Sequence, residues 1–236
     1  PLREALRCVM HIASHLTPKD QLSLVVYDDE VEVMVPLSEV SSVTAIQQAV
    51  GMVHSGGSTD LFSGWLKGAE QLEGGTARAV SRVILLSDGQ ANHGKTQISD
   101  IEPHCKAWLE KGVSTTTVGL GRGFNEDLMI AMADAGGGQQ YYGQTAEDLY
   151  DSFDQELSLL QAMYLRGIAL KLIPAPGVIV EMLSVAPQHP DGTYKMNDLA
   201  WGAETWVGVR LHISPTAPGT LRDLLAVSIT GTDLQG

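Results

Sequence analysis

Two short polar segments carry the side chains of this chain that are best suited to chemistry. Ser87-Asp88-Gly89 directly follows the apolar run 83–86 (Val-Ile-Leu-Leu), and residues 56–60 (Gly-Gly-Ser-Thr-Asp) form a second polar segment upstream. A carboxylate on the loop after a buried strand, joined by a hydroxyl from a neighbouring loop, offers the oxygen ligands that a hard divalent cation prefers. Such loops meet at the carboxyl edge of an open α/β sheet. The two segments together predict a metal site.

Regular apolar patterns predict the elements that position these segments. Apolar residues recur every three or four positions over residues 2–16, which is typical of a helix with one buried face. Residues 22–27 read as a buried strand, and a turn at Asp28-Asp29 leads into the alternating strand 31–35, which makes a hairpin. Further helices are expected at 43–54, 61–72, 98–111, 125–135 and 146–160, and further strands at 82–86, 113–118 and 139–142.

Strands that alternate with helices indicate a mainly parallel sheet covered on both faces. We therefore expect an α/β fold with a doubly wound, mainly parallel sheet, in which strands 22–26, 83–86 and 113–118 lie together. After residue 160 the pattern changes to strand-like runs separated by Pro and Gly turns. This predicts a first domain at 1–161 and a smaller β-rich, sandwich-like domain at 162–236, which the chain end could leave incomplete.

Over about residues 1–160 the chain resembles a von Willebrand factor A (VWA) domain, of the bacterial type that carries a β-sandwich after it. The resemblance rests on the order and spacing of strand 22–26, the Gly-Gly-Ser-Thr-Asp-Leu turn, strand 84–86 with Ser-Asp-Gly, and strand 113–118 with Gly-Leu-Gly. It implies a metal ion-dependent adhesion site, with Thr59 and Asp88 as ligands here. The implied ion is Mg²⁺, with Mn²⁺ or Ca²⁺ as alternatives, and the implied partner is a protein that offers Asp or Glu. Adhesion or assembly through a bridging ion involves no enzyme activity.

A third ligand element of that family, an Asp-x-Ser-x-Ser loop after the central strand, is absent from this sequence. The chain already opens, at Pro1-Leu2-Arg3, in the helix that follows the loop in the family. Without its central strand, a parallel sheet would leave the edges of two neighbouring strands unpaired. We therefore expect that strand and loop to come from upstream or from another chain, and metal occupancy to depend on them.

Three alternative interpretations use the same residues. One is a metal-assisted hydrolase or phosphoryl-transfer enzyme in which Asp88 binds the metal and His93 acts as acid and base. Another is a scaffold whose metal site is degenerate. In the third, Asp88-Gly89 is an ordinary turn and Thr59 caps the helix that begins at Asp60.

Composition limits the partners. The chain has 236 residues, of which 28 are acidic and 15 basic, and its formal net charge is −13. This charge disfavours nucleic acid and anionic membranes and favours cations. No apolar run approaches the ~20 residues that span a bilayer. Cys8 and Cys105 show no Cys-x-x-Cys or Cys/His ligand spacing, which argues against disulfides and a zinc site. Two such thiols favour a reducing, cytoplasmic compartment, but the compartment and the oligomeric state stay open.

Overall fold

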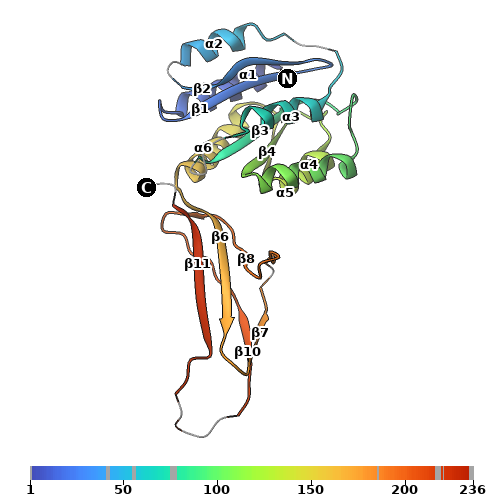
Figure 1. Ribbon diagram of the computed structural model, residues 1–236. Coiled ribbons are helices and arrows are strands. Elements are labelled where there is room, and N and C mark those ends of the chain that lie inside the picture. Colours follow the sequence, from blue (N-terminus) through green and yellow to red (C-terminus); the bar gives the residue numbers. More distant parts are fainter. Residues whose placement is uncertain are drawn as a thin grey trace. The chain divides into compact units, whose positions relative to one another are not determined.

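Figure 1 shows the helices and strands of the protein in a computed structural model. The structure describes residues 2–40, 43–54, 57–74, 79–184, 186–215, 219 and 221–233. The chain divides into two compact units, Pro1–Ser158 and Leu159–Gly236. The first unit contains α1 (Leu2–His15), β1 (Gln21–Tyr27), β2 (Val31–Glu39), α2 (Val43–Gly51), α3 (Leu61–Gln71), β3 (Ser81–Ser87), α4 (Ile98–Glu110), β4 (Val113–Leu120), α5 (Glu126–Ala135), β5 (Gly137–Gly143) and most of α6 (Glu147–Gln161). All the expected elements of this unit are present, although α2 ends early, at Gly51.

Parallel strands form the centre of the first unit. β3 pairs in parallel with β4, and β4 pairs in parallel with β5. β1 and β2 form the expected antiparallel hairpin. The expectation that β1 also joins the parallel sheet is wrong, because in the described part of the chain β1 pairs with β2 alone and β3 is an edge strand. The physical reason is that the strand which the resemblance places between them is not in this sequence, whose first element is α1.

Three consecutive threonines in β4 orient the helices around the sheet. All three are fully buried, and a buried hydroxyl needs a hydrogen-bond partner. Each bonds to a different helix: Thr115 accepts from Trp65 Nε1 of α3 (3.0 Å), Thr116 donates to Glu156 of α6 (2.8 Å), and Thr117 donates to the Met129 oxygen of α5 (2.8 Å). Because successive side chains of a strand point to opposite faces, α3 and α5 cover one face and α6 the other. The predicted α/β fold, with helices on both faces, is confirmed.

Two apolar cores hold these layers together. The larger one lies between the parallel sheet and helices α3, α4 and α5, and its buried members include Leu61, Trp65, Val83, Ile101, Cys105, Leu128 and Met132. The smaller one joins α1 and α2 to the hairpin, with Ala13, Val40, Ile46 and Val50 buried and Leu22 and Leu24 packed against them. Most members of both cores belong to the helices and strands that the apolar patterns predicted.

A buried carboxylate fixes α6 to the sheet. The Glu156 side chain is 1% exposed and forms an ion pair with Arg82 of β3. Its Oε1 also accepts from Thr116, and its Oε2 accepts from the Tyr141 hydroxyl of β5 over 2.9 Å. A buried charge is tolerated when it is paired and hydrogen-bonded in this way. One residue of α6 therefore contacts all three parallel strands.

Polar contacts also join α1 to α6. They connect Glu4 with the Ala146 N–H, Arg7 with Glu147, and His11 with Asp154. The paired residues are separated along the sequence by 142, 140 and 143 positions. Because this separation is nearly constant, the two helices lie side by side and run in the same direction.

The second unit is built from antiparallel strands, as the sequence predicts for this part. It contains β6 (Met163–Pro174), β7 (Val178–Met182), β8 (Tyr194–Lys195), β9 (Leu199–Ala200), β10 (Val209–Ile213) and β11 (Leu225–Asp233). β6 pairs with β11, β8 and β9, while β10 pairs with β7. The two-residue strands β8 and β9 are not expected from the sequence, because so short a segment carries no period.

The two cysteines are free and fully buried. Burial raises the pKa of the Cys8 and Cys105 thiols to about 12, so both remain protonated and pack as small apolar groups. Among the helices of the described ranges, none has the length and apolar character required to cross a membrane.

Candidate functional site

The two polar segments identified in the sequence lie against each other. The Thr59 N–H donates to Asn92 Oδ1 over 2.7 Å, and the Thr59 backbone oxygen accepts from the N–H groups of Asn92 and His93, each at 3.2 Å. The loop before α3 is therefore bonded to the loop after β3, at the carboxyl edge of the parallel sheet. This is the edge at which open α/β sheets bind ligands.

Asp60, and not Thr59, caps α3. The Asp60 carboxylate accepts from the Ser63 N–H over 3.0 Å and from the Ser63 hydroxyl over 2.9 Å. The interpretation of Thr59 as the cap is therefore wrong. Both residue types cap helices well, and here the carboxylate occupies the capping position. The Thr59 hydroxyl is consequently not required at the start of the helix.

Thr59 and Asp88 lie on the two bonded loops. A Cβ atom added to Gly89, the residue after Asp88, would lie 3.6 Å from Thr59 Oγ1. The Asp88 side chain is exposed, and within the described ranges its carboxylate has no hydrogen bond or ion pair with another residue. A hydroxyl and an exposed carboxylate are suitable ligands for a hydrated divalent cation. That Thr59 and Asp88 share one ion stays a prediction.

A third loop, between β4 and α5, completes this edge of the sheet. Gln90 Nε2 donates to the backbone oxygens of Gly123 and Phe124, at 2.9 Å each. A Cβ atom on Gly123 would lie 2.9 Å from the Asp88 backbone oxygen, which is closer than such contacts normally come. Glycine at this position therefore allows the third loop to approach Asp88 closely.

His93 lies at the rim of the same edge. Its Nδ1 is 3.4 Å from Asp60 Oδ2, and its side chain is 55% exposed. Gly94 follows with φ of 65°, and a Cβ atom there would lie 2.5 Å from the Asp60 carboxylate. Only glycine suits a position with both features, so this turn holds His93 beside the start of α3.

Two residues of this region were not identified from the sequence. Asn92 joins the two loops, but nothing in its local pattern distinguishes it from an ordinary loop residue. Tyr27, at the end of β1, donates to the Leu86 backbone oxygen over 2.8 Å. Burial raises the pKa of the Tyr27 phenol; a hydrogen bond with Ser87 opposes this, and the negative charge of Asp88 adds to it. The end of β1 is therefore joined to β3 two residues before Asp88.

The chain spans only part of the length of the curated relatives that it matches. It is 22% identical over 236 residues to the uncharacterized protein sll0103 of Synechocystis sp., covering 93% of this chain and 55% of that protein. A solved von Willebrand factor type A protein of Catenulispora acidiphila superposes with a TM-score of 0.70 at 20% identity, covering 100% of this chain and 59% of that one.

A second solved structure contains a metal. Proximal thread matrix protein 1 of the mussel byssus, with a zinc-occupied metal ion-dependent adhesion site (MIDAS) motif, superposes with a TM-score of 0.52 at 17% identity, over 68% of this chain and 42% of that one. At these identities the likeness shows the fold alone. The sequence model of the von Willebrand factor type A domain, however, matches residues 1–155. With this match and the parallel β3-β4-β5 sheet between two helical layers, the chain belongs to the von Willebrand factor type A domain family.

Proposed function

We propose that this chain is a metal-dependent protein-interaction module that binds an acidic side chain of a partner through a divalent cation. Thr59 and Asp88 contribute ligands to that cation, and an Asp-x-Ser-x-Ser loop contributes further ones. Mg²⁺ is the ion of choice, because the donors are a hydroxyl and a carboxylate and the remaining positions are left to water or to the partner. The module functions in adhesion or assembly and carries out no reaction.

This proposal rests on one observation: the fold does not use the side chains of the two candidate ligands, Thr59 and Asp88, within the described residues. The Thr59 backbone is fixed by three hydrogen bonds, while Asp60 takes over the cap of α3. A polar group whose main chain is held rigidly and whose side chain is not used by the fold is well placed to bind a ligand. An exposed carboxylate on the adjoining loop supplies the negative charge that a cation requires.

The charge of the chain supports a partner held through a metal. A formal net charge of −13 repels an acidic partner at long range, so an acidic side chain needs a cation between it and this surface. The same charge disfavours nucleic acid.

The enzymatic alternative has weaker support. Its acid and base, His93, faces Asp60, but the Asp60 carboxylate already accepts two hydrogen bonds from Ser63 at the start of α3. The pairing of His93 with Asp60 is therefore explained by the turn at Gly94 and the cap of the helix. Mg²⁺-dependent hydrolysis of a phosphate ester that is lost in His93→Gln would favour the enzyme over the module.

Calorimetric titration with MgCl₂ tests the proposal, in a form of the protein that carries the Asp-x-Ser-x-Ser loop. We expect Asp88→Ala to abolish Mg²⁺ binding and Thr59→Val to weaken it at least tenfold, whereas Thr59→Ser keeps the hydroxyl and binds normally. Asp29→Ala, which removes another exposed carboxylate at the tip of the β1–β2 hairpin, is the matched control. Equal Mg²⁺ affinity for Asp88→Ala and Asp29→Ala would eliminate the site.

We also propose a domain division at residue 161, with the interaction module at 1–161 and a sandwich-like β-rich domain at 162–236. The proposal is supported by the end of α6 at Gln161 and by the antiparallel pairing of all the strands that follow in the described ranges. Limited proteolysis that releases a stable fragment ending near this residue is the expected result.

A further inference from the structure

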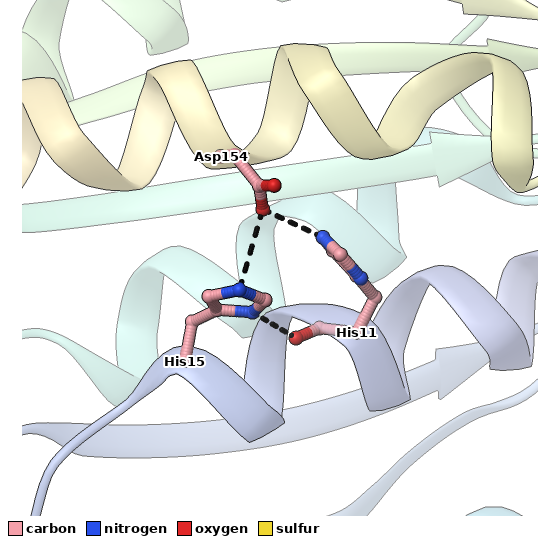
Figure 2. A group of neighbouring side chains, drawn as sticks. All are labelled: His11, His15 and Asp154. Atoms are coloured by element: carbon pink, nitrogen blue, oxygen red, sulfur yellow. Dashed lines mark hydrogen bonds and ion pairs between the residues drawn. The ribbon is translucent and has the colours of Figure 1, made fainter.

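A second group of potential metal ligands lies away from the loops of Thr59 and Asp88, on the paired helices α1 and α6. Figure 2 shows His11 and His15 of α1 pointing toward Asp154 of α6. The Asp154 Oδ1 atom is 2.7 Å from His11 Nε2 and 3.5 Å from His15 Nε2. One ligand atom from each of the three residues lies within 4.8 Å of the others. These are the distances over which several side chains can bind one ion.

The local structure explains why the three side chains converge. His11 and His15 are four positions apart, so they lie on the same face of α1. The His11 ring also stacks on the Tyr150 ring, with centroids 4.1 Å apart and planes at 9°. Tyr150 and Asp154 are likewise four positions apart on α6. His11 is therefore held by two residues of one face of α6 before any ion binds.

The hydrogen bond of the second histidine indicates which nitrogen is available. His15 Nδ1 lies 2.9 Å from the His11 backbone oxygen (Figure 2). Since a carbonyl oxygen only accepts, this nitrogen carries the proton and donates. In the neutral ring, Nε2 then has a free lone pair that faces the Asp154 carboxylate. Two acceptors that face each other need a cation between them, which is either a proton on Nε2 or a metal ion. Metal-binding histidines commonly have their second nitrogen fixed in this way.

We propose that His11, His15 and Asp154 bind a divalent transition-metal ion, with Zn²⁺ as the best match. Two imidazoles and one carboxylate form a three-residue ligand set that leaves a fourth position for water or for a partner. Mg²⁺ and Ca²⁺ prefer oxygen ligands, so this site differs in metal class from the proposed site at Thr59 and Asp88.

The two distances to Asp154 are close to those of a metal site, and the two histidine ligand atoms lie within 4.8 Å of each other. Bonds of ~2.0–2.1 Å in a tetrahedral site place ligand atoms about 3.3 Å apart. The distance of 3.5 Å between His15 and Asp154 already agrees with this value, while His11 and Asp154, at 2.7 Å, would move slightly apart. The proton that His11 Nε2 now directs at Asp154 is displaced when the metal binds, and the neutral ring carries a proton on Nδ1 instead. Because the His15 and Asp154 side chains are 44% and 48% exposed, an ion can enter from solvent.

A metal bound here would cross-link the first and last helices of the module. His11 and Asp154 are 143 positions apart in the sequence, so the ion would add a long-range cross-link to the polar contacts that already join α1 and α6. We expect Zn²⁺ to raise the thermal stability of the chain, because a ligand that binds only the folded state shifts the equilibrium toward it.

Zn²⁺ titration of the Asp88→Ala variant tests this proposal, since that background removes the other candidate metal site. We expect one Zn²⁺ per chain and a rise in melting temperature of about 5–10 °C at a hundredfold excess over the dissociation constant. In the Asp88→Ala background, a second substitution, His15→Gln or Asp154→Asn, should weaken Zn²⁺ binding more than tenfold and abolish the rise in melting temperature. Co²⁺ should give the visible absorption of a four-coordinate site in the parent and lose it in both variants.

The matched control replaces His54, an exposed histidine on the loop after α2, by Gln, which should change none of these measurements. Equal Zn²⁺ affinity for His15→Gln, Asp154→Asn and His54→Gln would overturn the proposal. The proposal would also be overturned if lower pH stabilised the chain and Zn²⁺ did not, because the three residues would then form an ion pair with protonated histidine. Loss of Mg²⁺ binding in Asp88→Ala leaves this test unaffected, so the two proposals fail independently.

Discussion

The Tyr27 phenol at the end of β1 donates a hydrogen bond to the backbone oxygen of Leu86 in β3, over 2.8 Å. β1 and β3 share no strand pairing in the described ranges, so this bond connects the hairpin to the parallel sheet directly. α3 provides a second connection, because it packs against β1, β2 and β3.

Replacing Tyr27 by Phe should therefore destabilise the chain. The change keeps the ring and removes one part-buried hydrogen bond, so we expect a loss of about 1 kcal/mol in the free energy of unfolding. Urea denaturation measures it. Tyr142→Phe, at a tyrosine whose side chain is 47% exposed, is the control and should change stability by less than about 0.5 kcal/mol. Equal effects would show that the bond to Leu86 contributes nothing.

Gly64 in α3 should not tolerate a methyl group. Its Cβ atom would lie 2.3 Å from the Tyr27 ring, so Gly64→Ala has to displace that ring and should cost about 1–3 kcal/mol, despite the better helix propensity of Ala. Gly51→Ala, at the end of α2 where a Cβ atom meets nothing within 4 Å, should be neutral or stabilise by up to about 1 kcal/mol. Thermal melts of both variants test the pair. A stabilised Gly64→Ala would contradict the observed packing of Tyr27.

The Glu156 network should be among the most sensitive points of the fold. Glu156→Ala removes the buried carboxylate that pairs with Arg82 and accepts from Thr116 and Tyr141, so we expect a loss of about 3–5 kcal/mol. Tyr141→Phe removes one bond and should cost about 1 kcal/mol. Glu110→Ala, at an exposed glutamate near the end of α4, is the control. Guanidinium denaturation gives the three values, and a loss below 1 kcal/mol for Glu156→Ala would contradict the prediction.

Acid should weaken the docking of α6. The Arg7 side chain lowers the pKa of Glu147, and hydrogen bonds from the Thr145 N–H and hydroxyl and from the Gln144 N–H lower that of Asp148. A carboxyl whose pKa is lower in the folded state stabilises the fold above its unfolded pKa of about 4 and loses this contribution as pH falls through the folded value. We therefore expect urea midpoints to fall below about pH 4.

The double variant Glu147→Gln, Asp148→Asn should reduce that pH dependence and leave less stability to lose at low pH. Asp29→Asn, at the exposed hairpin tip, should leave the pH profile unchanged. If the double variant kept the full acid sensitivity, other carboxyl groups would be responsible for it.

The sequence by itself determined the elements and their order. Apolar residues repeat every three or four positions in α1 and every two in β2, and such periods arise from the local geometry of helix and strand. The change of pattern after residue 160 likewise predicted antiparallel strands. The same local signals located the two polar loops, because each follows or precedes an apolar run.

Only the tertiary structure decided how these elements meet. Thr59 and Asp60 are both good capping residues. In the structure the Thr59 N–H bonds to Asn92, and Asp60 caps α3. The spacing of His11 and His15 is visible in the sequence, but their partner Asp154 is brought beside them by the parallel docking of α1 and α6. The local repeats of apolar residues carry no information about such contacts. The contacts depend on which faces of segments more than a hundred residues apart pack together. The prediction that β1 joins the parallel sheet is wrong for a different reason, because the strand that the resemblance places between β1 and β3 is not in this sequence.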